Sequence, residues 1–125
     1  MSQHDEVLAA LETAFGFPDV SIIVRSVGAI AEVRGPLKPR RGSEWLTLGE
    51  ESGSHVHLKA EDIRAFRFAE PGDGNLALEV LGDGGALLCK VSFRRTNPAR
   101  PDGYDRERAE SVKARFQHLR EREAT

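Results

Sequence analysis

The sequence predicts an α+β fold in which a curved, mainly antiparallel sheet of about seven strands is flanked by an N-terminal and a C-terminal helix. Apolar residues recur with helical spacing near both ends of the chain, whereas β-branched and alternating segments fill residues 20–93. The connections between the predicted strands are too short for helical crossovers, which favours antiparallel pairing. The 125 residues fit a single domain, 1–125.

The two predicted helices cover residues 3–15 and 104–122. Each carries apolar side chains along one side and charged side chains elsewhere, the pattern of a helix packed on a core. Ser2 and Asp5 have the spacing of a capping pair for the first helix. Asp102 is the expected N-cap of the second.

Seven segments are rich in β-branched residues or alternate apolar with polar residues, which predicts strands. They are residues 20–25, 29–34, 44–48, 54–58, 63–68, 75–81 and 86–93. Residues 35–42 contain two prolines and two glycines and predict a loop. The glycine-rich residues 82–85 predict a tight hairpin. We expect the helices to cover one face of the sheet and leave the other for a ligand or a second copy of the chain.

Composition excludes several classes of protein. Eighteen Lys and Arg against 20 Asp and Glu leave a net charge of −2, which disfavours nucleic acid as a partner. No apolar run approaches the ~18–20 residues of a membrane-spanning helix, so no membrane insertion is expected. The N-terminus lacks a signal-peptide pattern. The single cysteine, Cys89, rules out an internal disulfide, and a bacterial-type cytoplasmic protein is expected.

His55 and His57 are two residues apart in a predicted strand, and therefore project to the same face of the sheet. Two imidazoles on one face could bind a metal ion or a heme iron. From spacing alone, two solvent-exposed histidines on a polar face are the favoured interpretation. A zinc site would need a third protein ligand, for which Glu44 and His118 are unsupported candidates.

Trp45 and Thr47 share a face of the preceding predicted strand. If residues 44–48 pair with residues 54–58, an aromatic side chain would lie beside the histidines. A tryptophan buried in the core is the competing interpretation, and the sequence slightly favours it.

Few other residues are candidates for catalysis or ligand binding. Basic side chains cluster in two predicted loops, where they could hold carboxylates or phosphates or could simply be solvated: Lys38, Arg40 and Arg41 in one, Arg94, Arg95 and Arg100 in the other. Cys89 is expected to be a small packed residue rather than a nucleophile. No serine elbow, P-loop or dinucleotide-binding fingerprint is present, so the sequence offers no catalytic constellation.

The order of several short motifs resembles the intracellular heme-utilisation carrier family of the ChuX/HutX type. The motifs are IAEVRGPL at 30–37, WLTL at 45–48, HLKAEDI at 57–63, LCKV at 88–91 and the helix around 116–119. The resemblance extends from about residue 20 to residue 119. It implies a curved antiparallel sheet flanked by helices, heme bound on the sheet for delivery or storage, and a homodimer.

The resemblance also implies roles for particular residues. His57 corresponds to the axial heme ligand of some members, and Trp45 would lie against the porphyrin. Arg25 stands where some members carry a second histidine, and either Arg25 or the basic residues of the 38–41 loop, Lys38 and Arg40, would meet the propionates. His55 has no clear counterpart and is grouped with these residues because it shares a face with His57.

Two other functions stay open at this point. The chain could be a heme-free interaction or structural module that uses the free sheet face for dimer or partner contacts. Heme degradation is an enzymatic alternative that the family context alone motivates.

Overall fold

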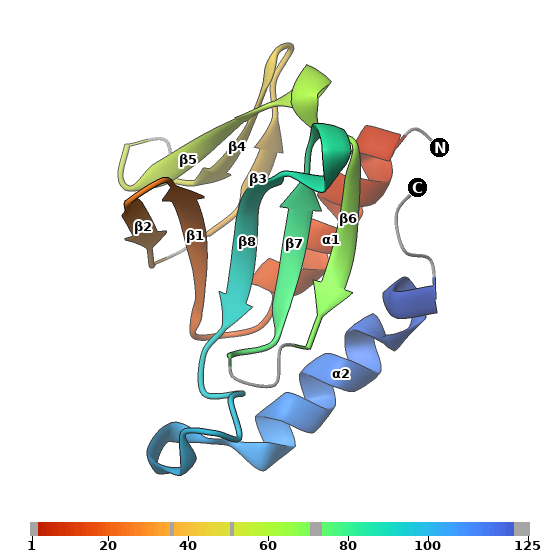
Figure 1. The fold of residues 1–125 in the computed structure, drawn as a ribbon. Helices are drawn as coiled ribbons and strands as arrows, with labels where there is room; N and C mark the ends of the chain where they lie inside the picture. Colours follow the sequence, from red (N-terminus) through yellow and green to blue (C-terminus); the bar gives the residue numbers. More distant parts are fainter. Residues whose placement is uncertain (1–2, 36, 51, 71–73, 122–125) are drawn as a thin grey trace.

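The computed structural model describes residues 3–35, 37–50, 52–70 and 74–121. Over these described residues, one α-helix precedes eight strands and a second α-helix follows them along the sequence (Figure 1). The order is α1 (Gln3–Phe15), β1 (Val20–Ser26), β2 (Ala29–Val33), β3 (Pro39–Arg41), β4 (Trp45–Gly49), β5 (His55–Lys59), β6 (Ala65–Ala69), β7 (Ala77–Leu81), β8 (Leu87–Phe93) and α2 (Arg106–Glu121). Short 3₁₀ turns lie at Ala60–Asp62, Asp83–Gly85 and Pro101–Gly103.

The strands form two sheets. One has five strands in the order β2-β1-β8-β7-β6, and the other has three in the order β3-β4-β5. All neighbouring strands within these sheets are antiparallel. The predicted α+β class, with a terminal helix at each end and a mainly antiparallel sheet, is confirmed. The described strands number eight, close to the expected seven, and they are hydrogen-bonded in one group of five and one group of three.

The additional strand is β3, in the segment 35–42 that the sequence predicts to be a loop throughout. Pro39 pairs with Leu48, and the next two residues continue the pairing with β4. The prolines misled the prediction because a proline cannot donate a backbone hydrogen bond in a central strand. Here Pro39 is the first residue of an edge strand, a position where the missing donor is tolerated.

The turn at residues 82–85 confirms the predicted hairpin between β7 and β8, with Gly84 and Gly85 at positive φ angles of 66° and 80°. The expected N-cap Asp102 was wrong. It lies in the 3₁₀ turn before α2, and Asp105 caps the helix instead, accepting a hydrogen bond from the Arg108 backbone N–H at 3.0 Å. The predicted capping residue Ser2 lies outside the described residues.

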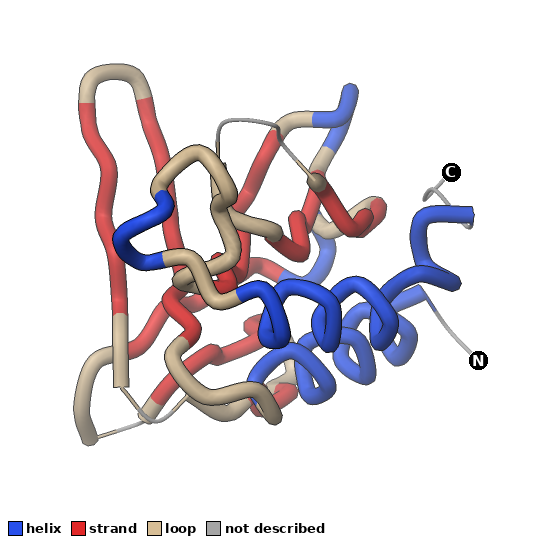
Figure 2. Tube along the Cα trace, turned by 90° about the horizontal axis from the view of Figure 1, so that it is seen from below, coloured by secondary structure: helices blue, strands red, loops and turns tan. Residues whose placement is uncertain are grey.

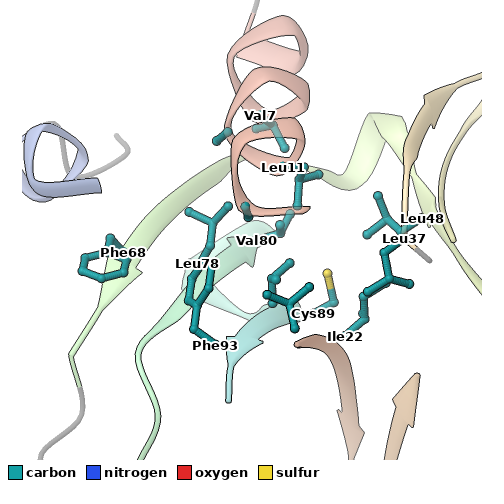
Figure 3. Close-up of a cluster of buried hydrophobic side chains, with 14 of the residues drawn as sticks. Val7, Leu11, Ile22, Leu37, Leu48, Phe68, Leu78, Val80, Cys89 and Phe93 are labelled. Carbon is teal, nitrogen blue, oxygen red and sulfur yellow. The ribbon is translucent and has the colours of Figure 1, made fainter. Parts of the chain in front are cut away.

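One buried hydrophobic cluster joins the two sheets and both helices. In Figure 3, Leu11 of α1 lies with Val80 and Cys89 of the five-stranded sheet, while Leu48 approaches from the three-stranded sheet. Burying an aliphatic side chain of this size stabilises a fold by ~1.5–3 kcal/mol. Cys89 is fully buried, which confirms the expectation of a packed residue, and this burial raises the pKa of its thiol to about 12.

Helix α2 packs on the edge of the five-stranded sheet through Phe116. The Phe116 ring stacks on Phe68 with centroids 5.5 Å apart, and it also contacts Phe93 at 5.5 Å. The β1–β2 hairpin extends away from both helices (Figure 2). At its end Val27 is fully exposed and Ile30 is 63% exposed. Within the described residues, neither helix combines the length and apolarity needed to span a membrane.

Candidate functional site

The three-stranded sheet has one apolar face and one polar face. Leu46, Leu48 and Leu58 point inward and are buried. Residues that are directly paired across antiparallel strands share a face. The opposite face, here termed the histidine face, therefore consists of Arg40, Trp45, Thr47, Gly49, His55, His57 and Lys59. The strand at 44–48 does pair with the strand at 54–58, the condition under which an aromatic side chain would lie beside the histidines.

His57 lies at the centre of this face. It is exposed, and its Nδ1 atom is 2.9 Å from the hydroxyl oxygen of the buried Thr47, the residue directly opposite in β4. The Trp45 ring is on the same face, with its centroid 6.1 Å from that of His57. Trp45 is 45% exposed, so the interpretation of a tryptophan buried in the core was wrong. Nδ1 thus faces Thr47, and within the part of the chain that the structure describes no hydrogen bond is found for Nε2 of His57.

His55 is held by the turn that precedes it. Its Nδ1 lies 2.8 Å from the carbonyl oxygen of Gly53 and 3.0 Å from that of Glu50. A carbonyl oxygen can only accept, so Nδ1 carries the ring proton, and Nε2 of the neutral ring carries the lone pair. The rings of His55 and His57 contact each other with centroids 4.7 Å apart. Sequence spacing predicted their common face, but not these backbone contacts.

Gly49 makes this turn possible. Its φ angle is +124°, and a Cβ atom there would lie 2.4 Å from the Ser54 carbonyl oxygen and 2.8 Å from the His55 Cα. The Glu50 backbone N–H donates to that same Ser54 oxygen at 3.1 Å. The absence of a side chain at position 49 thus lets the β4–β5 turn close tightly enough to hold His55. The sequence reasoning missed Gly49, although a glycine at a strand end is a signal for such a close approach.

A hollow of about 800 Å³, open to solvent, adjoins the histidine face. Lys38 and Arg40 line it together with Thr47, Gly49 and Glu50. Two cationic side chains at an open hollow suit an anionic group of a ligand. The structure thus brings together five of the predicted site residues, Lys38, Arg40, Trp45, His55 and His57, around the three-stranded sheet.

Other predicted basic residues have different partners. Arg41 forms an ion pair with Asp5 of α1. Arg94 and Arg95 both pair with Asp19, at 3.1 Å and 2.9 Å. These three arginines therefore connect parts of the fold.

Arg25 belongs to the five-stranded sheet, on the exposed end of β1 and opposite Ile30. Its part in the site stays a prediction. Among the described residues, no group of three or more His, Cys, Asp or Glu side chains is arranged to hold a metal ion. The candidate third zinc ligand Glu44 therefore joins no such group, and the His118 side chain lies outside the described residues.

No protein-family model and no curated protein matches the chain. Solved structures do match. A crystal structure of ChuX is 17% identical with a TM-score of 0.70, and the alignment covers 96% of this chain and 76% of that one. A second structure, of the heme binding protein ChuX, is 20% identical with a TM-score of 0.64, covering 95% and 73% of the two chains.

A protein from Erwinia carotovora gives 17% identity and a TM-score of 0.70, covering 94% of this chain and 74% of that chain. At these identities the likeness establishes the fold. The chain thus has the fold of ChuX, as the ChuX/HutX resemblance of its motifs predicts.

Proposed function

We propose that this protein binds heme on the histidine face and acts as a cytoplasmic heme carrier or store, with His57 as the axial ligand. The observation that carries the proposal is the exposed imidazole of His57, whose Nδ1 contacts Thr47 while Nε2 is left for iron. Neutral imidazole is a common axial ligand of heme. A hydrogen-bond partner on the other ring nitrogen helps to hold the orientation of such a ligand.

The surroundings of His57 fit a flat, partly apolar anion. The half-exposed indole of Trp45 offers apolar contact area beside the imidazole. Lys38 and Arg40 line the adjoining hollow and would pair with the propionates. The same fold in ChuX, described as a heme binding protein, supports the proposal. Arg25 is a further candidate for a propionate contact.

Any second ligand to the iron would come from outside the histidine face. His55 and His57 lie on one side of the sheet, so they cannot bind one iron from opposite sides of the porphyrin. Solvent or a second copy of the chain would complete the coordination. We propose a homodimer as well, supported by the exposed apolar residues Val27 and Ile30 on the β1–β2 hairpin and by the unpaired outer edge of β2 among the described strands.

Titration of the purified protein with hemin tests the proposal, with the Soret band as the readout. We expect stoichiometric binding, and loss of the histidine-ligated spectrum in His57→Ala. His55→Ala is the matched control, since it removes an imidazole from the same face and should keep that spectrum. An unshifted Soret band with the wild type, or an unchanged spectrum with His57→Ala, would contradict the proposal.

The exposed apolar hairpin also favours the second candidate, a heme-free interaction module. Sedimentation of the protein with and without hemin separates the two functions. A dimer that forms without hemin, together with no Soret shift, would support the interaction module. Hemin-dependent spectra at one heme per chain would exclude it as the sole function.

A further inference from the structure

His55 and His57 form a pair that the heme proposal uses only in part. We propose that the two Nε2 atoms together chelate a divalent transition-metal ion, with Cu²⁺ bound most tightly. This inference is independent of heme binding, because it needs only the two imidazoles and water. It assigns a ligand role to His55, which the ChuX/HutX resemblance leaves without a counterpart.

The geometry of the pair favours a chelate. The two side chains leave β5 on the same face, and their ring centroids are 4.7 Å apart. Each Nδ1 already has a partner: the carbonyl oxygens of Gly53 and Glu50 for His55, and the Thr47 hydroxyl for His57. Metal-ligating histidines nearly always use their other nitrogen in this way, which sets the tautomer and orients the ring. The carbonyl oxygens already fix the ring proton of His55 on Nδ1, and the Thr47 hydroxyl can accept a hydrogen bond from Nδ1 of His57 in the tautomer that binds a metal through Nε2.

The number of protein ligands available favours Cu²⁺ over Zn²⁺. Zinc sites use ~3–4 protein ligands, and among the described residues no third His, Cys, Asp or Glu joins the pair. Cu²⁺ accepts tetragonal sites of nitrogen and oxygen ligands, in which water can complete the shell. It also heads the general affinity order of the divalent first-row ions. We therefore expect the affinity order Cu²⁺ over Ni²⁺ over Zn²⁺.

The positive charge of Arg40 on the histidine face should affect the affinities for Cu²⁺ and for hemin in opposite directions. Arg40 lies opposite Thr47, which lies opposite His57, so the backbones of Arg40 and His57 are two strand spacings apart, ~10 Å. At low ionic strength that distance is not fully screened. Arg40 therefore repels a bound cation and attracts an anionic porphyrin. Arg40→Gln should strengthen Cu²⁺ binding and weaken hemin binding.

The experiment is a titration of the full chain with CuCl₂ in a weakly coordinating, low-salt buffer, followed by calorimetry and by electron paramagnetic resonance. The chain has four histidines, so a His4→Ala/His118→Ala variant serves as the background and leaves positions 55 and 57 alone. We expect one Cu²⁺ per chain, with nitrogen hyperfine structure. Adding His55→Ala or His57→Ala should each lower the affinity at least ~tenfold.

The result that would overturn the chelate is a Cu²⁺ affinity within about twofold of the background in either single variant. Failure of the chelate and failure of heme binding are distinguishable. His55→Ala should lose Cu²⁺ and keep the hemin spectrum, whereas His57→Ala should lose both. If Cu²⁺ fails to bind while hemin binds through His57, the chelate is wrong and the heme proposal stands. If Cu²⁺ binds through the pair without any hemin complex, the chelate alone is correct.

Discussion

Replacing Gly49 by alanine should weaken the β4–β5 hairpin and with it the histidine face. The φ angle of +124° is one that L residues rarely adopt, and the new Cβ would lie 2.4 Å from the Ser54 carbonyl oxygen and 2.8 Å from the His55 Cα. Both neighbours are backbone atoms, so no flexible side chain can move aside. Strained backbone costs ~1–3 kcal/mol and steric overlap costs ~1–3 kcal/mol, which gives a loss of about 2–6 kcal/mol in unfolding free energy.

Urea denaturation monitored by circular dichroism measures this loss. Gly28→Ala is the matched control, because Gly28 also has a positive φ angle, +80°, but a Cβ there meets nothing within 4 Å. The control should lose only the backbone cost of a positive φ angle, so the additional loss in Gly49→Ala reports the overlap together with the less accessible φ angle of +124°. If Gly49→Ala were as stable as Gly28→Ala within about 0.5 kcal/mol, the claim that close backbone approach fixes this turn would be refuted.

Three further predictions concern the site, the core and the dependence of stability on pH. Thr47→Val removes the Nδ1 partner of His57 at nearly constant shape, so hemin affinity should fall ~10-fold or more in spectral titrations while the fold persists. Phe116→Ala empties a site that is 1% exposed, and urea denaturation should show a loss of ~3–5 kcal/mol; a loss below about 1 kcal/mol would contradict the packing described. The hydrogen bond from Ser21 and the neighbouring arginines lower the pKa of Glu32, so its folded form binds fewer protons than its unfolded form. Its stabilisation, below about 1 kcal/mol at this exposed site, is present above pH ~4.5 and lost as pH falls through the folded pKa, and Glu32→Gln should flatten the acid limb of the stability curve.

Local sequence patterns predicted most of the secondary structure because they depend on neighbouring residues. The apolar stripe of α1 and the alternation in β4 and β5 are examples, since the same side chains that give the period also enter the core. The alternation in β4 also placed Trp45 on the face opposite Leu46 and Leu48, which is where it lies. The general tendency of tryptophan toward burial led to the wrong preference for a core position.

The errors arose where long-range contacts decide the local structure. Pro39 led us to predict a loop, but its pairing with Leu48 makes β3 an edge strand. The division into two sheets also depends on such pairings, because β1 pairs with β8, a strand distant in sequence. Similarly, Asp102 lies within the turn at Pro101–Gly103, so α2 begins after it and Asp105 caps the helix.

The sequence allowed us to predict several residues of the candidate site, but not the hydrogen-bond partners of those residues. The two-residue spacing placed His55 and His57 on one face, and the basic residues at 38 and 40 were predicted to be either solvated or able to hold an anion. The partners of the two Nδ1 atoms depend on the register of β4 with β5 and on the tight turn at Gly49. A single sequence does not encode these contacts as a local pattern.

The central claim is that the histidine face is the ligand-binding surface. Backbone and imidazole NMR shifts of labelled protein, measured on adding diamagnetic zinc protoporphyrin, test it most directly. We expect the largest changes at His57, Thr47 and Trp45, which share this face. Changes centred instead on Lys90 and Glu79, paired in the five-stranded sheet, with His57 unaffected, would contradict it.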